Sequence, residues 1–584
     1  MGRRIFDIAR KVEKNYPKED FLATKEKGVW SKTSTEEFIR LSDAFSRGLI
    51  KLGIKKGEKI ALITTSTRTE WAIADRGILQ IGGITVPVYP TITPADYEFI
   101  FKDAKIRYCI VSDRELLSKV KHIKSLTAVY SFDPIENTKN WKEILELGRD
   151  FSTQNEVQKI ADTIQDNEVA TIIYTSGTTG KPKGVMLSHR NIVSNIEASQ
   201  ERIPLAEGCH YKEVRALSFL PICHIFERML FYLYQDNGFS IYFAESLDKI
   251  GENIKEVKPH YMAVVPRLLE KIYDKIYEKG TSSGKIKALV FLWAVTLLEK
   301  KENISAPSTW KEIIADRLVF KKWREALGGR IVALISGSAA LSLRLNKIFQ
   351  NAGIPILEGY GLTETSPVIA VNSFDKIKPG TVGHVLKNLE IKIEPDGEIT
   401  VKGPSVFVGY FNNPELTENA FTEDGFFKTG DIGHIDEEGY LKITDRKKEM
   451  FKTSGGKYIA PQIIENLAKT SKFIEQIMVV GEGEKMPCAI IQPDFNFAKN
   501  WAKRHHLKVP ASNKEISQMP ELKERIKKEI EKINKELGNW EQIKKIELSP
   551  EIWSVEGGEL TPTLKLKRKA VKEKYQNLYL NLYS

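Results

Sequence analysis

The sequence predicts an α/β protein with two parts. These are a large N-terminal domain of parallel-sheet α/β layers carrying a small β subdomain, and a separate α+β C-terminal lid. Three observations predict this architecture. The 584 residues exceed the size at which one hydrophobic core stops growing. Short apolar runs alternate with helical patterns through most of the chain, and the pattern changes near position 390 and again near 447. We therefore expect domains at 1–447 and 448–584.

The N-terminal half alternates between strand-like and helix-like segments. Residues 59–64 (KIALIT) and 84–88 (ITVPV) are short apolar runs typical of buried strands, and the apolar spacing of 34–52 and 71–80 is helical. A helix between two buried strands is typical of βαβ units in a largely parallel sheet. Similar strand-like runs recur at 261–265, 331–335 and 354–357.

The C-terminal third changes character twice. Short alternating strands separated by Gly, Asp and Glu turns (389–403 and 439–446) predict the small antiparallel β subdomain. Strand-like runs at 477–480 and 488–492 then precede a charged helix at 520–537, whose apolar residues recur every three or four positions. That spacing predicts one packed and one solvated helix face.

The composition indicates a globular protein of a reducing compartment. Hydrophobic residues make up 41% of the chain and charged residues 28%, which is ordinary for such proteins. The four cysteines are scattered, with neither a CxxC pair nor metal-ligand spacing. This favours reduced thiols and a cytoplasmic location over a disulfide framework. The N-terminus lacks the uninterrupted apolar stretch of a secretory signal.

The net charge of +11 leaves alternatives open. It indicates a lysine-rich surface, attraction to anionic substrates such as nucleotides and coenzyme A, or peripheral association with an anionic membrane. We expect no nucleic-acid partner, because the lysines are dispersed and no recognition motif is visible. The apolar run 288–298 has about half of the roughly 20 residues needed to span a bilayer. It predicts a buried helix. The alternative is a helix that lies at the membrane interface and admits a hydrophobic substrate from the membrane.

The segment 170–189 (ATIIYTSGTTGKPKGVMLSH) carries the clearest chemistry. A strand-like run, 171–174, leads into a cluster of Thr, Ser and Gly followed by two lysines. Small residues let backbone N–H groups and hydroxyls surround phosphate oxygens, and lysine adds positive charge. A Walker A loop is excluded, because Lys181 is followed by Pro182 rather than by Ser or Thr. The order of strand, hydroxyls, glycines and lysines predicts a phosphate-binding loop.

The motif TSGTTGKPKGV resembles the phosphate-binding signature of the adenylate-forming superfamily, which includes acyl-CoA synthetases, luciferases and peptide-synthetase adenylation domains. Further segments similar to that family's motifs follow in the family's order, so the resemblance covers about 170–570. They are LPICHIFER (220–228), ISGSAAL (335–341), EGYGLTET (358–365), FKTGD (427–431), TDRKKEMFKTSGGKYIAP (444–461) and LTPTLKLKR (560–568). The collinear set is more specific than any single motif.

The resemblance implies an enzyme with two half-reactions. A substrate carboxylate attacks the α-phosphate of ATP to give acyl-AMP and pyrophosphate, and the thiol of coenzyme A then displaces AMP. The carboxylate is already ionised at neutral pH, so it needs no general base. The chemistry then depends on positioning and charge neutralisation, which Mg²⁺, lysines and backbone donors supply.

The same resemblance implies how ATP is held. Thr175 and Glu364 would hold Mg²⁺, a hard ion that favours hydroxyl and carboxylate oxygens. Tyr360, between two glycines, would stack on adenine. The alternative is that Tyr360 is an aromatic residue of the hydrophobic core. The β- and γ-phosphates would lie against the loop residues Thr175, Ser176, Gly177, Thr178, Thr179, Gly180, Lys181 and Lys183.

Other positions are implied to surround the nucleotide and the acid. Asp431 would accept hydrogen bonds from the ribose hydroxyls, and Arg446 would reach the ribose or the phosphates. His224 would lie at the mouth of the acyl pocket, although a lone His is usually structural, and Ala339 and Gly361 would also line the acid site. The remaining nucleotide-binding positions implied by the motifs are Gly337, Ser338, Glu358, Gly359, Gly361, Thr363, Lys448 and Lys452.

The C-terminal part is implied to be a mobile lid that rotates about Lys448 between the two half-reactions. Before rotation Lys565 would point at the carboxylate and the α-phosphate, and after rotation the loop 454–458 would help form the pantetheine tunnel. Many family members have Gly before the catalytic lysine, whereas Leu564 precedes it here. The alternatives for the adenylation lysine are therefore Lys567 and Lys569.

The C-terminal motifs look most like those of the long-chain fatty acyl-CoA synthetase branch. Amino-acid activators place an Asp just after the position that His224 matches, whereas Ile225 here would leave a substrate ammonium buried and unpaired. The predicted reaction is therefore ligation of a long-chain fatty acid to coenzyme A. Three alternatives to this reaction stay open: an aryl or medium-chain substrate, acyl carrier protein as the acceptor, and a catalytically silent lipid- or nucleotide-binding protein. The sequence also leaves open whether the protein forms an oligomer.

Overall fold

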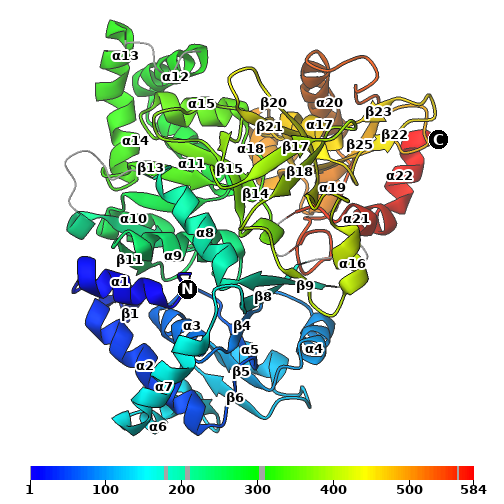
Figure 1. Cartoon of the computed structure of the whole chain (residues 1–584). Coiled ribbons are helices and arrows are strands. Elements are labelled where there is room, and N and C mark those ends of the chain that lie inside the picture. Colours follow the sequence, from blue (N-terminus) through cyan, green and yellow to red (C-terminus); the bar gives the residue numbers. More distant parts are fainter. Residues whose placement is uncertain (1, 176–181, 204–210, 302–308, 562–564) are drawn as a thin grey trace. The chain divides into compact units, whose positions relative to one another are not determined.

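The computed structural model describes residues 2–175, 182–203, 211–301, 309–561 and 565–584 (Figure 1). The chain forms two compact units. The first comprises Met1–Ile391, Val401–Phe427 and Glu437–Leu441, and the second comprises Lys392–Thr400, Lys428–Asp436 and Lys442–Ser584. The predicted domain boundary between 447 and 448 stays a prediction.

The first unit contains an eight-stranded sheet. Its strands are β3 (Lys59–Ile63), β4 (Ile84–Pro87), β5 (Tyr108–Val111), β6 (Ala128–Ser131), β7 (Lys139–Asn140), β8 (Val169–Thr175), β9 (Lys183–Ser188) and β19 (Gly409–Tyr410). The strand order is β19-β9-β8-β4-β3-β5-β6-β7. The strands from β8 to β7 in this order run parallel, while β9 turns back antiparallel on β8 and pairs with β19. The two strands that flank the predicted phosphate loop in the sequence, β8 and β9, therefore pair with each other within a buried sheet.

Side chains along β3 show why this sheet is buried on both faces. Ile60 and Leu62 belong to one hydrophobic core, whereas Ala61 and Ile63 belong to another. The helices in the first core include α2 (Thr35–Lys51) and α3 (Thr69–Gln80), and those in the second are α4 (Pro94–Asp103) and α5 (Arg114–Val120). Parallel strands covered by helices on both faces are typical of α/β proteins, and they confirm the predicted fold class.

A second, nine-stranded sheet lies in the same unit, in the order β16-β15-β14-β13-β12-β10-β11-β1-β2. Its strands are β1 (Leu22–Glu26), β2 (Val29–Thr33), β10 (Arg215–Ser218), β11 (Ser240–Phe243), β12 (Tyr261–Val264), β13 (Ala333–Ser336), β14 (Ile356–Gly361), β15 (Val368–Val371) and β16 (His384–Val385). The inner strands are parallel, and antiparallel strands complete both edges. The largely parallel sheet expected from the alternating pattern is confirmed.

Helix α2 shows how the local sequence sets an element. The Ser34 hydroxyl accepts a hydrogen bond from the Glu37 N–H at 3.1 Å, which is an N-cap interaction. The further helices of this unit are α1 (Asp7–Asn15), α6 (Trp141–Leu147), α7 (Gln154–Thr163), α8 (His189–Gln200), α9 (Ile225–Asp236), α10 (Ile250–Val257), α11 (Pro266–Ser282), α12 (Lys285–Lys300), α13 (Trp310–Ala315), α14 (Lys321–Ala326), α15 (Leu343–Asn351) and α16 (Pro414–Asn419). Single turns are η1 (Phe151–Thr153), η2 (Tyr211–Glu213), η3 (Asp316–Phe320) and η4 (Thr363–Thr365).

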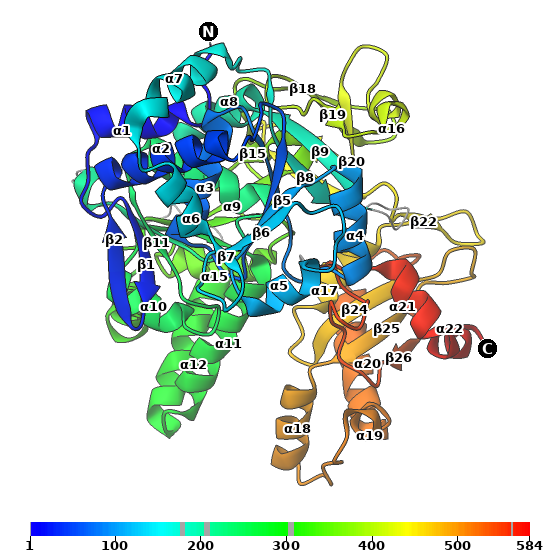
Figure 2. The ribbon, with the colours of Figure 1, turned by 90° about the horizontal axis from the view of Figure 1, so that it is seen from below.

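The apolar run 288–298 lies in α12, which is buried on one face only. Figure 2 shows α12 beside α11. Phe291 of α12 packs against Tyr277 of α11, with ring centroids 5.7 Å apart. On the opposite face Ile286 is 78% exposed and Leu289 is 67% exposed. The expectation of a buried helix is therefore half met. Among the helices of the described residues, none combines the length and the apolar character that crossing a bilayer requires.

The second unit contains a three-stranded sheet in the order β24-β25-β26 and a short hairpin, β22–β23. Its strands are β22 (Phe451–Lys452), β23 (Tyr458–Ile459), β24 (Ile474–Val480), β25 (Cys488–Pro493) and β26 (Ile546–Leu548). Its helices are α17 (Pro461–Ala468), α18 (Phe495–Arg504), α19 (Asn513–Ser517), α20 (Pro520–Asn534), α21 (Arg568–Lys574) and α22 (Gln576–Tyr583). On α20, Leu522, Ile526, Ile530 and Ile533 are buried, which confirms the predicted amphipathic helix.

The predicted β subdomain is also present. Four strands, β17 (Glu390–Ile393), β18 (Glu398–Lys402), β20 (Phe427–Ile435) and β21 (Leu441–Arg446), form a sheet in the order β17-β18-β20-β21. The division of the chain into two units falls within these strands.

Candidate active site

The hairpin β8–β9 presents the two ends of the phosphate-loop motif. Thr175, the last residue of β8, pairs with Lys183, the first residue of β9. The hydroxyl of Thr175 is buried and has no hydrogen-bond partner among the described residues. The predicted phosphate ligands Ser176, Gly177, Thr178, Thr179, Gly180 and Lys181 lie outside the described residues.

Lys183, Glu364 and Tyr410 form a closed set of polar contacts. The Lys183 Nζ lies 2.9 Å from Glu364 Oε1 and 2.8 Å from the Tyr410 hydroxyl. That hydroxyl in turn donates to Glu364 Oε1 at 2.8 Å, and Lys183 Nζ stands 4.2 Å from the centroid of the Tyr410 ring. Three elements distant in sequence, β9, η4 and β19, thus bring one cation and one carboxylate together at the end of the phosphate hairpin.

Opposing effects act on the ionisation of Glu364. Burial by itself raises the pKa of this carboxyl, but the Lys183 ammonium and the hydrogen bonds outweigh burial and hold the pKa below its usual value. For Tyr410, burial and the neighbouring Glu364 charge both raise the pKa. Glu364 is therefore a carboxylate throughout the neutral range, and Tyr410 is a neutral donor.

The backbone holds Glu364 in place. Glu364 lies in η4, between β14 and β15, and its carbonyl accepts a hydrogen bond from the Phe407 N–H at 2.8 Å. The next carbonyl, that of Thr365, accepts from the Asn195 side chain at 3.3 Å. A Cβ at Gly361 would come within 1.7 Å of the Pro367 carbonyl oxygen, so only glycine fits where the chain doubles back. Thr363, which precedes Glu364, is half-buried.

Tyr360 occupies the end of β14 and is half-buried. A Cβ at its neighbour Gly359 would approach the Val371 side chain to 3.3 Å. The preceding residue, Glu358, is buried, and its carboxylate accepts from the Leu341 N–H at 3.0 Å and from the Asn346 amide at 3.2 Å. Burial raises the pKa of Glu358 to about 7. The Glu358 carboxylate thus holds the segment after β13, whereas the Tyr360 ring remains a candidate for adenine stacking.

The segment Gly337, Ser338 and Ala339 follows β13 directly. A Cβ at Gly337 would lie 3.2 Å from the Phe226 ring, and Ser338 has φ +69°, in the left-handed region. Ala339 is exposed. The turn is tight on its Gly337 side, where it packs against α9, and open on its Ala339 side.

His224 is the N-cap of α9. Its Nδ1 accepts a hydrogen bond from the Phe226 N–H at 3.2 Å, and its ring stands edge-on to Tyr89 at 6.5 Å. Ile225, which follows, is buried. His224 therefore has a structural role at the start of α9, and a role toward an acyl substrate stays a prediction.

A buried ion pair holds α9 in the first unit. Arg228 donates to Asp75 Oδ1 at 2.5 Å and to Thr171 on β8 at 2.7 Å, and Tyr232 also donates to Asp75. The side chain of Arg228 is 0% exposed and that of Asp75 is 2% exposed. These contacts connect α9, α3 and β8, so they fix the position of His224 and of the strand that leads to Thr175.

In the second unit, the two predicted ribose-contacting residues are neighbours. Asp431 on β20 is buried, and its Oδ1 lies 3.1 Å from Nε of Arg446, the last residue of β21. The adjacent Asp445 accepts from the backbone N–H groups of Arg446 at 2.5 Å and Gln462 at 3.3 Å, and burial raises the pKa of Asp445 to about 7. Asp431 and Arg446 can thus act together on one ligand group.

Lys448 lies in an exposed turn directly after β21. The N–H groups of Glu449 and Met450 donate to the Arg446 carbonyl at 2.9 and 3.1 Å and close this turn. Lys447 is held by Asp396 and Glu398. Beyond the turn, Lys452 in the hairpin β22–β23 stands 4.4 Å from the ring of Tyr458. The turn joins β21 to that hairpin through a short segment, which suits the predicted hinge.

Near the C-terminus, Lys565 is paired with Thr561. The Lys565 carbonyl accepts from the Thr561 N–H at 2.7 Å, and the Lys565 N–H donates to the Thr561 hydroxyl at 3.0 Å. Arg568, three positions further on, binds Glu465 at 2.6 Å and Glu449 at 3.2 Å. The three candidate lysines Lys565, Lys567 and Lys569 are all exposed. Exposure therefore does not choose among them, and of the three it is the backbone of Lys565 that pairs with Thr561.

Two groups in this geometry escaped sequence reasoning. Tyr410 completes the Lys183–Glu364 contacts, although no motif quoted for the sequence includes it. Asp75, the partner of Arg228 in the HIFER segment, was also missed. Each lies more than 40 positions from its partners, so no local pattern signals the contact. Arg228 and its neighbour Glu227 directly precede the apolar run 229–234 of α9, and a charged residue at the start of such a run was the available signal that a buried partner exists.

The first unit thus presents a hydroxyl, a lysine and a carboxylate at the end of a strand–turn–strand motif. These groups are of the types that suit a polyphosphate and a hard cation. The chain belongs to the AMP-binding enzyme family: residues 9–411 match that family, and residues 449–584 match the AMP-binding enzyme C-terminal domain. The superfamily inferred from the collinear motifs is confirmed.

Curated relatives match nearly the whole chain. Long-chain-fatty-acid–CoA ligase FadD15 of Mycobacterium bovis is 33% identical over 560 residues, covering 94% of this chain and 92% of the relative. Long-chain-fatty-acid–CoA ligase 1 of Homo sapiens is 30% identical over 591 residues, covering 94% and 82%. The predicted branch of the superfamily, that of the long-chain acyl-CoA synthetases, is confirmed by these matches.

Solved structures confirm the fold. O-succinylbenzoate coenzyme A synthetase from Bacillus subtilis, in complex with ATP and magnesium ion, matches with a TM-score of 0.67 at 21% identity, covering 98% of this chain and 99% of that one. The adenylation domain of a carboxylic acid reductase from Segniliparus rugosus, in complex with AMP and a co-purified carboxylic acid, matches with a TM-score of 0.74 at 21% identity, covering 100% and 94%.

Proposed function

We propose that this protein activates a long-chain fatty acid with ATP and transfers it to coenzyme A. In the first step a carboxylate oxygen bonds to the α-phosphorus of ATP and the bond to pyrophosphate breaks. In the second step the coenzyme A sulfur bonds to the acyl carbon, AMP leaves and the thiol proton is released. The observation that carries the proposal is the Lys183–Glu364 pair beside the Thr175 hydroxyl, in a chain one-third identical to a long-chain-fatty-acid–CoA ligase.

The residues present fit a magnesium ion. The unpartnered Thr175 hydroxyl and the Glu364 carboxylate are hard oxygen donors. No cluster of three or more His, Cys, Asp or Glu side chains suited to a metal occurs within the described ranges. Mg²⁺ usually binds through one or two protein oxygens together with phosphates and water, so a two-donor site is sufficient. When bound, the ion neutralises phosphate charge.

The protein's own groups then perform positioning and charge stabilisation. We expect Lys183 to exchange part of its contact with Glu364 for a phosphate oxygen, while Tyr410 keeps donating to Glu364. Tyr360 stacks on the adenine, and Asp431 and Arg446 hold the ribose. Because the acid is already ionised, these contacts act on a reaction that needs no base and depends on placing two anions together.

The change from the first half-reaction to the second is assigned to the second unit. We propose that Lys565 supplies positive charge during acyl-AMP formation and that Lys448 is the hinge that later replaces it with the loop 454–458. The support is local: the backbone of Lys565 is paired with Thr561 close to the ion pairs of Arg568, and Lys448 lies in an exposed turn between two strands. An exposed turn that precedes the charged residue in the chain suits a charge that is delivered and withdrawn.

A panel of acids tests the substrate class. We expect ATP–pyrophosphate exchange to depend on palmitate far more than on octanoate, benzoate or acetate, and thioester formation to require coenzyme A rather than acyl carrier protein. Exchange with no acid of the panel would contradict the proposal and favour a silent nucleotide-binding protein. Exchange that is strongest with benzoate or octanoate would retain the adenylate chemistry and reject the long-chain assignment.

We also propose that α12 contacts a membrane surface when the acid is collected. Its exposed residues Ile286 and Leu289 form an apolar stripe, and exposed lysines lie at both ends, at Lys285 and Lys300. The exposed Trp310 of α13 lies one short segment further on. Apolar residues bordered by lysines are typical of helices that lie in the interface of anionic bilayers. The stripe is thus suited to reach acyl chains.

Vesicle sedimentation tests this surface. Ile286→Gln with Leu289→Gln keeps good helix formers and should reduce binding to anionic vesicles several-fold, while exchange with soluble octanoate stays unchanged. Val29→Ser removes an equally exposed apolar residue elsewhere and serves as the matched control. Equal sedimentation of both variants and the parent chain would contradict a role for α12.

A further inference from the structure

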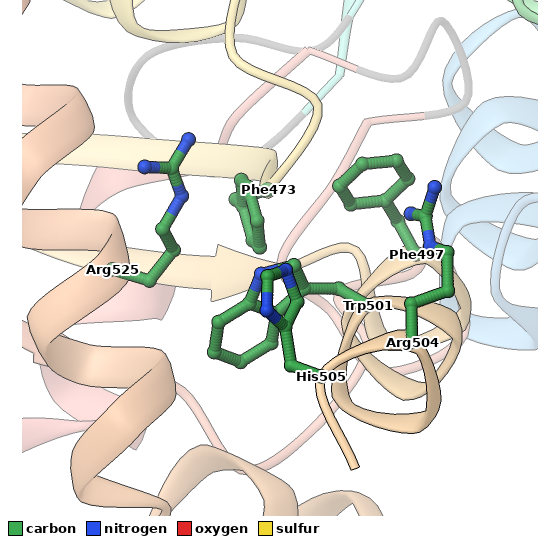
Figure 3. Close-up of a pocket in the computed structure, with 6 residues that line it drawn as sticks. All are labelled: Phe473, Phe497, Trp501, Arg504, His505 and Arg525. Atoms are coloured by element: carbon green, nitrogen blue, oxygen red, sulfur yellow. The ribbon is translucent and has the colours of Figure 1, made fainter. Parts of the chain in front are cut away.

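A pocket in the second unit is not used by the proposed chemistry. Figure 3 shows it between the start of β24, helix α18 and helix α20, with six lining residues. Its volume is about 500 Å³, within the usual range for small-molecule sites. The lining residues are Phe473, Phe497, Trp501, Arg504, His505 and Arg525.

The aromatic rings form a connected floor. The Phe473 ring lies 4.9 Å from that of Phe497 and 5.6 Å from that of Trp501, both edge-on. Trp501 and His505 stand 5.3 Å apart at 47°. Phe473 is buried, whereas Phe497 and Trp501 are half-buried at the rim. The floor is therefore fixed by the core below it, and the rings at the rim remain accessible to a planar group.

Two guanidinium groups flank these rings from opposite sides (Figure 3). Arg525 lies 5.0 Å from the centroid of Phe473, and Arg504 lies 5.7 Å from that of Phe497. Arg525 is held by Glu529 at 2.6 Å. Arg504 is exposed and forms no ion pair with any carboxylate of the described ranges. One positive group is thus positioned by the protein, and the other is available to an anionic ligand.

The charged residues of α18 and of the segment after it are all positive. Residues 495–514 contain no Asp or Glu, and their cations are Lys499, Lys503, Arg504, Lys508 and Lys514. Such a run attracts anions over several ångströms. Aromatic faces combined with arginine and a positive surround match the two chemical features of a nucleotide, a planar base and phosphates.

We propose that this aromatic–arginine pocket binds a free purine nucleotide, with the base against Trp501 and the phosphates at Arg504. It is a second nucleotide site, separate from the β8–β9 hairpin of the first unit. The volume suits one nucleotide rather than a nucleic-acid strand. The site does not depend on which acid the enzyme activates.

Equilibrium dialysis of labelled ADP with the full-length protein tests the proposal. We expect two equivalents bound to the parent chain, one to Arg504→Glu, one to Lys183→Glu, and none to the double variant. Lys183→Glu changes the proposed catalytic site, whereas Arg504→Glu changes the aromatic–arginine pocket. The dialysis therefore tests the two proposed nucleotide sites independently. If Lys183→Glu alone has no effect, the catalytic assignment is wrong, whereas two equivalents retained by Arg504→Glu would overturn the pocket.

Further variants distinguish binding of the nucleotide base from binding of the phosphate charge. Lys528→Glu makes the same kind of charge reversal on an exposed position of α20 outside the lining and should leave both sites intact. Trp501→Leu should weaken the pocket site roughly tenfold through lost stacking, and a normal circular dichroism spectrum excludes misfolding. Competition by inorganic phosphate that equals competition by ADP would show a simple anion site and overturn the proposed base contact.

Discussion

The two units hold their charges in different ways. In the first unit Glu364 is 6% exposed and bound to both Lys183 and Tyr410, and Arg228 and Asp75 are buried as a pair. In the second unit the three candidate lysines near the C-terminus lie on the surface, and the side chain of Lys569 is 91% exposed. Buried, mutually bonded charges are positioned before any ligand arrives, whereas an exposed lysine acts only where a ligand meets it. Changes to these buried pairs of the first unit should therefore affect stability and geometry, whereas changes to the exposed lysines of the second unit should affect a single step.

The largest expected effect is on stability. Arg228→Met leaves Asp75 buried without its partner and should lower the free energy of unfolding by about 3–5 kcal/mol, measured by denaturant titration. Arg149→Ala removes an ion pair whose side chains are 80% and 70% exposed and should change that free energy by less than about 1 kcal/mol. Similar losses in both variants would remove the distinction between buried and exposed charges.

The next effect isolates one half-reaction. Lys565→Ala should reduce acyl-AMP formation by roughly 10²–10³-fold, as expected for the loss of a group that stabilises transition-state charge. Thiolysis of supplied acyl-AMP by coenzyme A should remain within a few-fold of the parent rate. Lys567→Ala and Lys569→Ala test the two alternative lysines in the same two assays. If both steps survive Lys565→Ala and one fails in Lys567→Ala or Lys569→Ala, the adenylation lysine is another residue.

The third effect is a pH dependence of folding. The pKa of Glu358 is about 7 in the folded chain and near 4.5 when unfolded, so the folded state binds the proton more tightly. Stability from this group is complete below about pH 4.5 and is lost as pH rises through about 7. The loss is at most about 3 kcal/mol. Unfolding titrations at several pH values should show this slope in the parent and a flatter one in Glu358→Gln.

The smallest effects test the contacts around Glu364. Glu364→Gln should lower ATP–pyrophosphate exchange by roughly 10²-fold, about 2.7 kcal/mol, and weaken the dependence on Mg²⁺. Tyr410→Phe removes the hydroxyl that accepts from Lys183 and donates to Glu364, and it should lower exchange by roughly tenfold, about 1.4 kcal/mol. A Tyr410→Phe defect as large as that of Glu364→Gln would show that the hydroxyl contacts the substrate rather than positioning the carboxylate.

Several elements could be predicted because their signals are local. The apolar spacing of α2 and of α20 and the strand before Thr175 all depend on residues within a few positions of one another. The family could be recognised because its motifs recur in order. The one-sided burial of α12 was missed, because its central run is apolar on every face and only packing against α11 decides which face is covered.

The amino-acid sequence by itself determined the element types, the motif order and the residue types at the phosphate loop, because periodicity and residue chemistry act over short distances. Only the tertiary structure decided that Tyr410 completes the Lys183–Glu364 contacts, that Asp75 neutralises Arg228, and that Trp501 and Arg525 line one pocket. Those pairings join residues far apart in the chain, and which of them form depends on how sheets and helices pack rather than on any local pattern.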